Sequence, residues 1–324
     1  MKVVLDLSRL LREGKISQEE FDRLRRLAAQ DTGSLAVNIL IGLGVVAVAA
    51  GLVALLMNEY AVGAIGLVLL AGGLAFTYTG SRQWQVLSTI CVLVGALMLA
   101  GGIVVLGGGK LPSLLIATAV LTASALAGRS NLLVALAVLA LAGCLGASTG
   151  YWHATYALSI TEPTLTIVLF STLALAAFLA SSRVGPAYEA LALTASRVSL
   201  FLINFGFWIG SLWGDPLLLL RLLTAGDPRL VTSPTLRDVI VPAEVFIAGW
   251  AVALLAVAAW AVKANRRWVV NLAAVFGAIH FYTQWFERLG ATPVSVLVGG
   301  VLVLAFAVVA WKLNRKAEAM PAAA

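Results

Sequence analysis

From Leu35 onward the chain is a succession of long apolar runs, and these runs restrict it to one class of fold. A membrane-spanning helix needs roughly 20 predominantly apolar residues to cross a hydrocarbon core of about 30 Å. Runs of about this length lie near residues 35–57, 61–80, 86–107, 111–127, 131–150, 163–181, 194–213, 242–262, 268–286 and 292–312. We therefore predict an all-α fold: a polytopic transmembrane helical bundle of about ten spans over residues 33–316, followed by a disordered tail at 317–324.

The composition favours the same class and excludes an ordinary soluble domain. The 324-residue chain is 61% hydrophobic and 11% charged, with a mean hydropathy of +0.99, whereas roughly a quarter of the residues of a soluble domain are charged. The formal net charge is +7. The basic residues are scattered over short connections without stacking aromatics beside them, which argues against a nucleic-acid partner. The expected surroundings are the lipid bilayer.

The first 32 residues predict a separate cytoplasmic helical hairpin. Two apolar stripes at helical spacing mark its helices: Val4, Leu7, Leu10 and Leu11 in the first, and Phe21, Leu24, Leu27 and Ala28 in the second. Gly14 breaks the first helix. Ser17 and Glu20 have the spacing of a capping box, and Ile16 and Phe21 that of a hydrophobic staple. This polar start also lacks the basic tip and apolar run of a cleavable signal peptide.

Lysine and arginine placement orients the predicted spans. With a cytoplasmic N-terminus, 17 of the 22 Lys and Arg residues fall on the cytoplasmic side and 5 on the other. Cytoplasmic loops of membrane proteins carry such an excess. Tryptophans near the predicted boundaries would form the aromatic belts: Trp84, Trp260, Trp268 and Trp311 on the inner side, and Trp152, Trp213 and Trp285 on the outer side. We expect both termini to be cytoplasmic.

The one long external connection is predicted over residues 214–241. The pair Asp215–Pro216 at its start and the pair Asp227–Pro228 after the apolar run are turn signals. Between them "LLLLRLL" is too short to span a membrane. It could lie in the interface as a short helix with Arg221 reaching the headgroups, or form a re-entrant element.

Motifs of soluble catalysis are absent from the sequence: no phosphate-binding glycine loop, no His-Glu-x-x-His, no Cys-x-x-Cys and no Gly-x-Ser-x-Gly. Cys91 and Cys144 lie inside apolar runs and are interpreted as small buried hydrophobes. His153 and His280 lack ligands at metal-binding spacing. We therefore predict no catalytic residue, no metal and no cofactor. The small-residue faces expected to pack helices together are "GASTG" (Gly146 to Gly150) and "GFWIGSLWG" (Gly206 to Gly214).

Polar residues inside the predicted spans are the remaining candidates for function, because such groups are costly in lipid. Asn204 lies in the middle of the seventh span, Asn271 lies one turn inside the ninth, and Glu244 begins the eighth. The structural interpretation of each asparagine is a hydrogen bond between helices. That of Glu244 is a first-turn carboxylate favoured by the helix dipole. Transport is the functional alternative.

The ninth span carries a polar strip. At 100° per residue, His280, Gln284 and Glu287 share one face. Counted from Trp268, His280 lies ~18 Å along the helix, within the outer half of the bilayer, while Glu287 lies at ~28 Å, near the surface. The functional hypothesis is an outward-opening, proton- or cation-responsive strip with His280 as its titrating member. The structural alternative is a neutral histidine that is hydrogen-bonded to a neighbouring helix, because one partner is enough to satisfy a lone histidine within the membrane.

Two stretches resemble known families. The segment from Asn265 to Lys316 combines an Arg/Asn-started span, an aromatic and acidic exit, a glycine-containing last span and a basic tail, formed by Arg267, Asn271, Tyr282, Phe286, Glu287, Gly299, Gly300, Arg315 and Lys316. It resembles the DUF2157 family of bacterial polytopic membrane proteins. The stretch "EGKISQEEFDRL" resembles short SHOCT-type helical modules. These resemblances imply a bacterial inner-membrane protein and assign no catalytic residue.

Three classes of function follow. The favoured one is a non-enzymatic membrane protein whose residues 1–32 dock a second copy or a cytoplasmic partner protein. The alternative is a secondary transporter or channel for a small solute, with candidate site residues His280, Gln284, Glu287, Glu244 and Asn204; ten spans suit that class, although no repeat relates residues 35–150 to 163–312. The third is an enzyme acting on lipid at the outer surface, with candidate residues His153, Glu162, Glu244 and Glu287.

Overall fold

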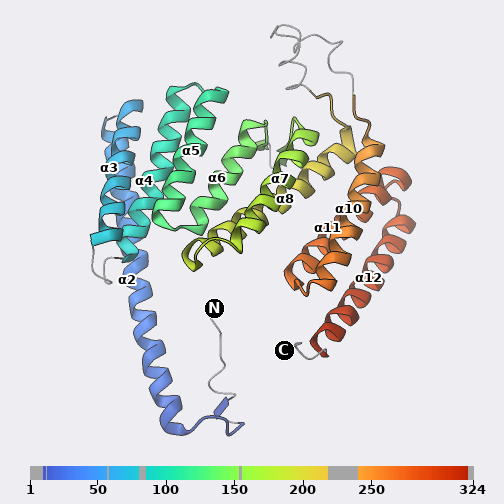
Figure 1. Ribbon diagram of the computed structural model, residues 1–324, viewed down its shortest axis with the longest axis horizontal. Coiled ribbons are helices and arrows are strands. Elements are labelled where there is room, and N and C mark those ends of the chain that lie inside the picture. Colours follow the sequence, from blue (N-terminus) through green and yellow to red (C-terminus); the bar gives the residue numbers. More distant parts are fainter. Residues whose placement is uncertain are drawn as a thin grey trace. The chain divides into compact units, whose positions relative to one another are not determined.

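The computed structural model describes residues 10–11, 13–56, 58–79, 85–152, 155–217 and 240–319. The chain divides into two compact units, Met1–Ala140 and Leu141–Ala324, and each is described by itself. The helices are labelled in chain order in Figure 1.

Each predicted run overlaps a helix, although some bounds differ; α8, for example, begins at Pro186, before the predicted start at 194. The first unit contains α2 (Gln18–Leu56), α3 (Glu59–Thr79), α4 (Gln85–Leu106), α5 (Leu111–Gly128) and most of α6 (Asn131–Cys144). The second unit contains β1 (Ser148–Trp152), β2 (Thr155–Ser159), α7 (Pro163–Ser181), α8 (Pro186–Trp213), α10 (Ala243–Lys263), α11 (Arg267–Leu289) and α12 (Pro293–Ala319).

Six helices in the described part of the chain are long and apolar enough to cross a membrane: α3, α4, α5, α7, α8 and α10. Large apolar side chains on them are exposed, among them Val68 at 70% and Leu255 at 72%, as expected of a surface that faces lipid. The chain is therefore a helical membrane protein. The predicted spans at 35–57, 131–150, 268–286 and 292–312 coincide with helices outside these six, so the number ten stays a prediction.

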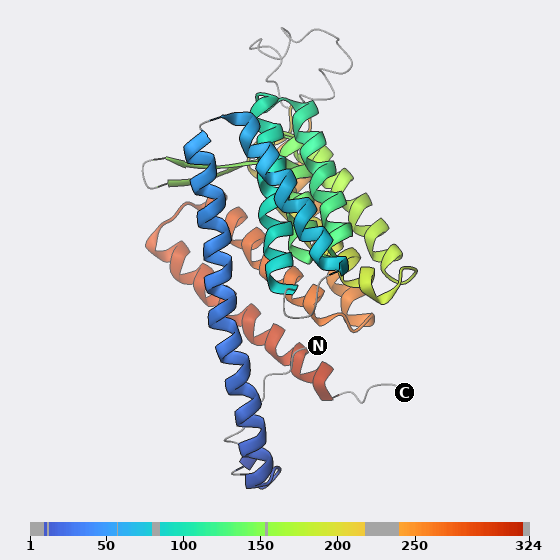
Figure 2. The same cartoon turned by 90° about the vertical axis from the view of Figure 1, so that its left-hand side faces the viewer.

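Helix α2 is one continuous rod. It runs for 39 residues from Gln18 to Leu56, which is about 58 Å at 1.5 Å per residue. The prediction of a separate hairpin ending at residue 32 is therefore wrong for its second helix. No proline interrupts this stretch, and a single interior glycine such as Gly33 costs only about 1 kcal/mol relative to alanine. Figures 1 and 2 show the N-terminal half of α2 extending past the other helices of its unit.

The turn that precedes α2 has the predicted caps. Gly14 adopts a φ of 68°, and its N–H donates to the carbonyl of Leu11 at 3.1 Å, ending the first helix. The Glu20 N–H donates to Ser17 Oγ at 3.1 Å, and the Ser17 N–H donates to Glu20 Oε2 at 2.9 Å. The capping box is thereby confirmed. Most of the first predicted helix lies outside the described residues.

Helices α3 and α4 approach each other closely at glycines. A Cβ placed on Gly66 would lie 2.5 Å from the backbone nitrogen of Leu99, and one placed on Gly95 would meet the backbone of α3. The close approach recurs one heptad further along each helix, at Gly73 and Gly102. In lipid, small residues of this kind let two backbones come within van der Waals contact. The small-residue face of the first unit therefore lies on α3 and α4.

Of the two glycine faces predicted from the sequence, one is confirmed and the other is wrong. Gly146 lies in a turn and Gly150 in a strand, so "GASTG" is not a helix face. In α8, Gly206 lies against Ile167 of α7, and Gly210 lies under the ring of Phe246 of α10. The glycine face of α8 is thus a packing face, as predicted.

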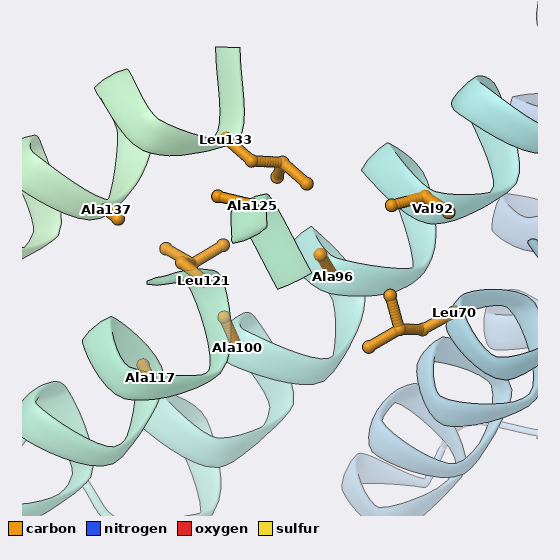
Figure 3. Close-up of a cluster of buried hydrophobic side chains, with 9 residues drawn as sticks. All are labelled: Leu70, Val92, Ala96, Ala100, Ala117, Leu121, Ala125, Leu133 and Ala137. Carbon is orange, nitrogen blue, oxygen red and sulfur yellow. The ribbon is translucent and has the colours of Figure 1, made fainter. Parts of the chain in front are cut away.

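One apolar cluster forms the core of the first unit (Figure 3). Small residues dominate it, which allows the helices to lie close together: Leu70, Val92, Ala96, Ala100, Ala117, Leu121, Ala125, Leu133 and Ala137. A polar contact adds to it, because Thr77 Oγ1 of α3 and Ser88 Oγ of α4 lie 2.6 Å apart in a hydrogen bond. Ser88 Oγ also donates to the carbonyl of Gly73 at 2.8 Å.

The single helix predicted over residues 131–150 is wrong at its C-terminal end, because α6 stops at Cys144. Gly146 follows with a φ of 79°, a conformation that ends helices and favours glycine. A side chain at this position would collide with Thr161. Thr161 Oγ1 in turn donates to the carbonyl of Leu145 at 3.0 Å, which holds the turn in place.

A two-stranded antiparallel ribbon follows α6 and departs from the all-α prediction. In β1 and β2, Ser148 pairs with Ser159 and Trp152 pairs with Thr155. The two strands are rich in threonine, tyrosine and tryptophan, residue types that favour extended backbone. His153, between the strands, lies outside the described residues.

The last helix, α12, continues to Ala319 and so passes the predicted span end at 312. The tail predicted at 317–324 therefore begins inside the helix, and residues 320–324 lie outside the described part of the chain. Lys, Arg, Ala and Glu after Trp311 are good helix formers, and the next proline is Pro321. No stop signal acts before that point.

We expect Gly95→Ala to lower the thermal stability of the detergent-solubilised protein, because the new Cβ meets the backbone of Leu70 and must push α3 away. Overpacking of this kind typically costs 1–3 kcal/mol. Gly101→Ala is the matched control, since Gly101 lies in the same helix with no atom within 4 Å of an added Cβ. It should leave the unfolding midpoint unchanged or raised. Equal midpoints for the two variants would contradict the close α3–α4 contact.

Candidate functional site

Trp250 of α10 joins the helices that carry the predicted polar residues. Its side chain is 0% exposed, and its Nε1 donates to Asn204 Oδ1 of α8 at 2.9 Å. The imidazole of His280 of α11 packs edge-on against the Trp250 ring, with centroids 4.8 Å apart and planes at 70°. His280 Nδ1 is buried and has no hydrogen-bond partner within the described residues. His280 therefore lies against a neighbouring helix, as the structural alternative predicts, but the contact is between rings, and among the residues described Nδ1 does not make the hydrogen bond expected of that alternative.

Two further hydrogen bonds connect α11 to α8. Trp208 Nε1 donates to Thr283 Oγ1 at 3.1 Å, and Gln284 Nε2 donates to Ser211 Oγ at 3.4 Å. Both bonds lie beyond His280 along α11, toward the predicted outer end. The α11 face that bears His280 and Gln284 is consequently a packing face between helices.

The two predicted carboxylates do not take part in the contacts between these helices. Glu287 of α11 and Glu244 in the first turn of α10 are both exposed, and within the described part of the chain neither carboxylate makes a hydrogen bond or an ion pair. The position of Glu244 suits a carboxylate at a helix N-terminus. Asn271, near the start of α11, is also exposed. The predicted strip is therefore divided, with His280 and Gln284 in contact with helices and Glu287 open to the surroundings.

Trp208 and Trp250 were not among the residues predicted from the sequence, although a signal for them exists. They fall inside the predicted spans 194–213 and 242–262, whereas the other tryptophans lie near predicted membrane boundaries. A tryptophan in the middle of a span has no water or headgroup to accept its indole N–H, so it needs an acceptor on another helix. Both indoles have one here.

A cavity of about 540 Å³ lies between α7, α8, α10 and α11. It extends from Asn204 and Trp250 toward the end of the unit where α10 ends and α11 begins. Its lining is mainly apolar, with Leu200, Val257 and Leu272 on three of the four helices. Its volume falls within the roughly 300–1,000 Å³ range of small-molecule sites.

Two arginines lie near the end of this cavity where α11 begins, Arg266 in its lining and Arg197 beside the lining residue Trp268. The Arg266 guanidinium lies 5.8 Å from the ring centroid of Phe178, and the Arg197 guanidinium lies 5.2 Å from that of Trp268. Phe178, Arg266 and Trp268 line the cavity. Both arginines are exposed, and within the described residues neither makes an ion pair. Stacking occupies the face of a guanidinium and leaves its N–H edges available to an anion.

Asp215, interpreted from the sequence only as a turn residue, connects three segments. Its side chain is 0% exposed. Oδ2 accepts the N–H of Thr164 in the first turn of α7 at 2.7 Å, and Oδ1 accepts the N–H of Leu217 at 2.7 Å. Its backbone pairs with Val241, just before α10. A buried carboxylate at the start of α7 also interacts favourably with the helix dipole.

This pairing closes the base of the external connection predicted over residues 214–241. Residues 218–239, which include "LLLLRLL" and Arg221, lie outside the described part of the chain. An interfacial helix and a re-entrant element therefore both stay predictions.

The residues considered for a lipid-directed enzyme lie in different surroundings. Glu162 is the N-cap residue of α7 and is 4% exposed, whereas Glu244 and Glu287 are exposed. His153 lies outside the described residues. Among the residues that the structure describes, no group of three or more His, Cys, Asp or Glu side chains could hold a metal ion.

We expect Asn204→Leu and Trp250→Phe to be energetically coupled. Asn204→Leu leaves a buried indole N–H without an acceptor, which costs about 1–3 kcal/mol. Trp250→Phe in turn leaves the Asn204 carbonyl oxygen without its donor. The double variant removes both partners, so its loss of unfolding free energy in detergent should fall short of the sum by about 0.5–3 kcal/mol. Strictly additive losses would show that the bond contributes nothing.

We expect both Asp215→Ala and Asp215→Asn to lower the unfolding midpoint in detergent. Alanine leaves two backbone N–H groups without acceptors, and asparagine supplies only one carbonyl oxygen for the two. Hydrogen bonds to a charged group are worth about 1.5–3 kcal/mol each. Glu244→Gln is the control, because that exposed carboxylate loses only a helix-dipole interaction of about 0.3–1 kcal/mol. A midpoint of Asp215→Asn equal to that of Glu244→Gln would be evidence against the connecting role.

Comparison of the chain with protein-family models, with curated proteins and with solved structures finds no match. The resemblance to the DUF2157 family and to SHOCT-type modules therefore stays an expectation.

Proposed function

We propose that this chain is a non-enzymatic, multi-pass protein of the bacterial inner membrane, with about ten spans and both termini in the cytoplasm, whose N-terminal head binds a partner protein. The head is defined as the turn at Gly14 and the part of α2 before Leu35. The observation that carries the proposal is the continuity of α2, which joins the head to the membrane-embedded part without a flexible linker.

The length of α2 supports a projecting head. About 58 Å of helix is roughly twice the thickness of a hydrocarbon core of about 30 Å. The apolar part of α2 begins near Leu40, and that part packs in its own unit, since Gly42 lies against Ile90 of α4. The charged N-terminal half exposes Arg23 and, at 37%, the apolar Leu24. A rigid helix of this kind presents its head in a fixed direction.

The ten-span arrangement and the orientation are supported by the order of the helices. Short turns join α4 to α5, α10 to α11, and α11 to α12, so successive helices reverse direction. The excess of lysine and arginine then falls on the side of both termini. The resemblance of the C-terminal segment to the DUF2157 family agrees with a bacterial inner membrane.

The packing of the polar residues favours a non-enzymatic protein over the transport alternative. Transport was predicted from an outward-opening strip that included His280 and Gln284. His280 lies against Trp250, and Gln284 donates to Ser211, so both serve helix contacts. The buried amide of Asn204 is likewise paired with Trp250. None of these contacts favours a solute path.

Insertions in α2 test the proposal. Two alanines inserted after Ser34 rotate the head by about 200° relative to the membrane part, whereas seven rotate it by about 700°, which returns it to within about 20° of its starting direction. A photo-reactive amino acid at position 24, exposed in the head, reports partner binding in cells. We expect a cross-linked adduct in the wild type and in the seven-residue insertion, and its loss in the two-residue insertion.

A photo-reactive residue at position 55 is the matched control, because Leu55 is 83% exposed at the opposite end of α2. Because position 55 lies far from the head, the residue there should give no adduct with a partner protein that binds the head. The mass of the adduct at position 24 distinguishes a second copy of the chain from another cytoplasmic protein. Absence of any adduct at position 24, or equal adducts in both insertions, would overturn the proposed role of the head.

A further inference from the structure

The cavity between α7, α8, α10 and α11 combines an apolar interior with a cationic inner end, where α11 begins. We propose that it binds one acyl chain of an anionic phospholipid, whose phosphate is held by Arg197 and Arg266. This site is independent of the head, and its assignment to the cytoplasmic leaflet rests on the proposed orientation.

The interior suits a hydrocarbon chain. The wall that α10 contributes, from Trp250 through Ala253 and Val257 to Trp260, is apolar apart from the indole nitrogens. Near Asn204 the Trp250 Nε1 donates to Asn204 Oδ1, and Asn204 Nδ2 donates to the carbonyl of Leu200, so both groups are already paired within the protein. A chain entering from the inner end would therefore meet apolar atoms along most of its length, and burial of apolar area is the main source of its affinity.

The inner end suits a phosphate. Arg197 lies in α8 and Arg266 is the N-cap residue of α11. Both stack on aromatic rings that hold their guanidinium groups in place. Pre-oriented guanidinium groups bind phosphate through paired N–H···O bonds, with little loss of side-chain entropy. Basic pockets between membrane helices on the cytoplasmic side are places where anionic headgroups bind.

Lipid is favoured over a water-soluble anion because the apolar cavity is continuous with the end that carries the two arginines. Phe178 lines the apolar cavity and also carries the stacked Arg266. Trp268 likewise lines the cavity and carries the stacked Arg197. A ligand that reaches both the arginines and the interior must have an anionic end joined to a long apolar part, as a phospholipid does.

Lipid binding to the full-length protein in detergent tests the site. Native mass spectrometry compares titrations with phosphatidylglycerol, which is anionic, and phosphatidylcholine, which has the same chains and no net charge. We expect phosphatidylglycerol to bind at least tenfold more tightly. Inorganic phosphate alone should not displace it, because phosphate lacks the chain that fills the cavity. Displacement by inorganic phosphate at the same concentration would overturn the assignment to lipid.

Four variants separate the headgroup from the chain. Arg197→Gln with Arg266→Gln should weaken phosphatidylglycerol at least tenfold and phosphatidylcholine much less, because the choline of phosphatidylcholine already neutralises its phosphate. Arg183→Gln is its control, an exposed arginine that does not line the cavity. Ala253→Phe should fill the cavity and abolish binding of both lipids at this site. Ala256→Phe, on the exposed side of the same helix, should retain both.

The thermal midpoint and elution volume of each variant show whether it is folded, and the two exposed arginines can be changed without disturbing the core. Equal affinity for the two lipids in the wild type would overturn the proposal. So would an unchanged phosphatidylglycerol affinity in the double arginine variant. A change of oligomeric mass in Ala253→Phe, without a change in lipid binding, would show that a second copy covers the cavity instead. None of these outcomes depends on the head, so each is distinct from a failure of the proposed function.

Discussion

The hydrogen bond from Trp250 to Asn204 is the contact on which the helix arrangement of the second unit depends. In a bilayer, apolar side chains gain little by leaving lipid for one another, so apolar surface alone does not select which helices pair. A buried indole N–H does select, because it needs an acceptor. Asn204 supplies that acceptor and fixes the rotation of α10 against α8. The ring of His280 packs against the same indole, which places α11.

The first unit selects its helix pairs by a different means. Glycines on α3 and α4 remove the side chains that would separate the two backbones, and the gain comes from dispersion contacts between main-chain atoms. The contact is reinforced by the hydrogen bond between Thr77 and Ser88. Close backbone packing tolerates no added atom, whereas the α8–α10–α11 packing tolerates a cavity next to its polar contact. This difference explains why a candidate ligand site lies in the second unit.

Features that depend on neighbouring residues in the chain could be predicted from the sequence. The turn at Gly14 and the capping box of Ser17 and Glu20 form within six or seven residues, so residue type and spacing were sufficient. Features that depend on competition between local preferences and distant contacts could not. The end of α6 requires Thr161 to occupy the space beside Gly146, and the buried role of Asp215 requires the start of α7, some fifty residues earlier in the chain.

The sequence by itself determined that the chain is helical and apolar enough for a membrane, and that His280 and Gln284 share a face of α11, because a period of 100° per residue is a property of the helix alone. Only the tertiary structure decided what lies opposite that face. Periodicity orients a side chain relative to its own helix axis and carries no information about the neighbouring helix. The contacts of His280 with Trp250 and of Gln284 with Ser211 arise between helices far apart in the chain. The cavity with its two arginines exists for the same reason, since four separate helices enclose it.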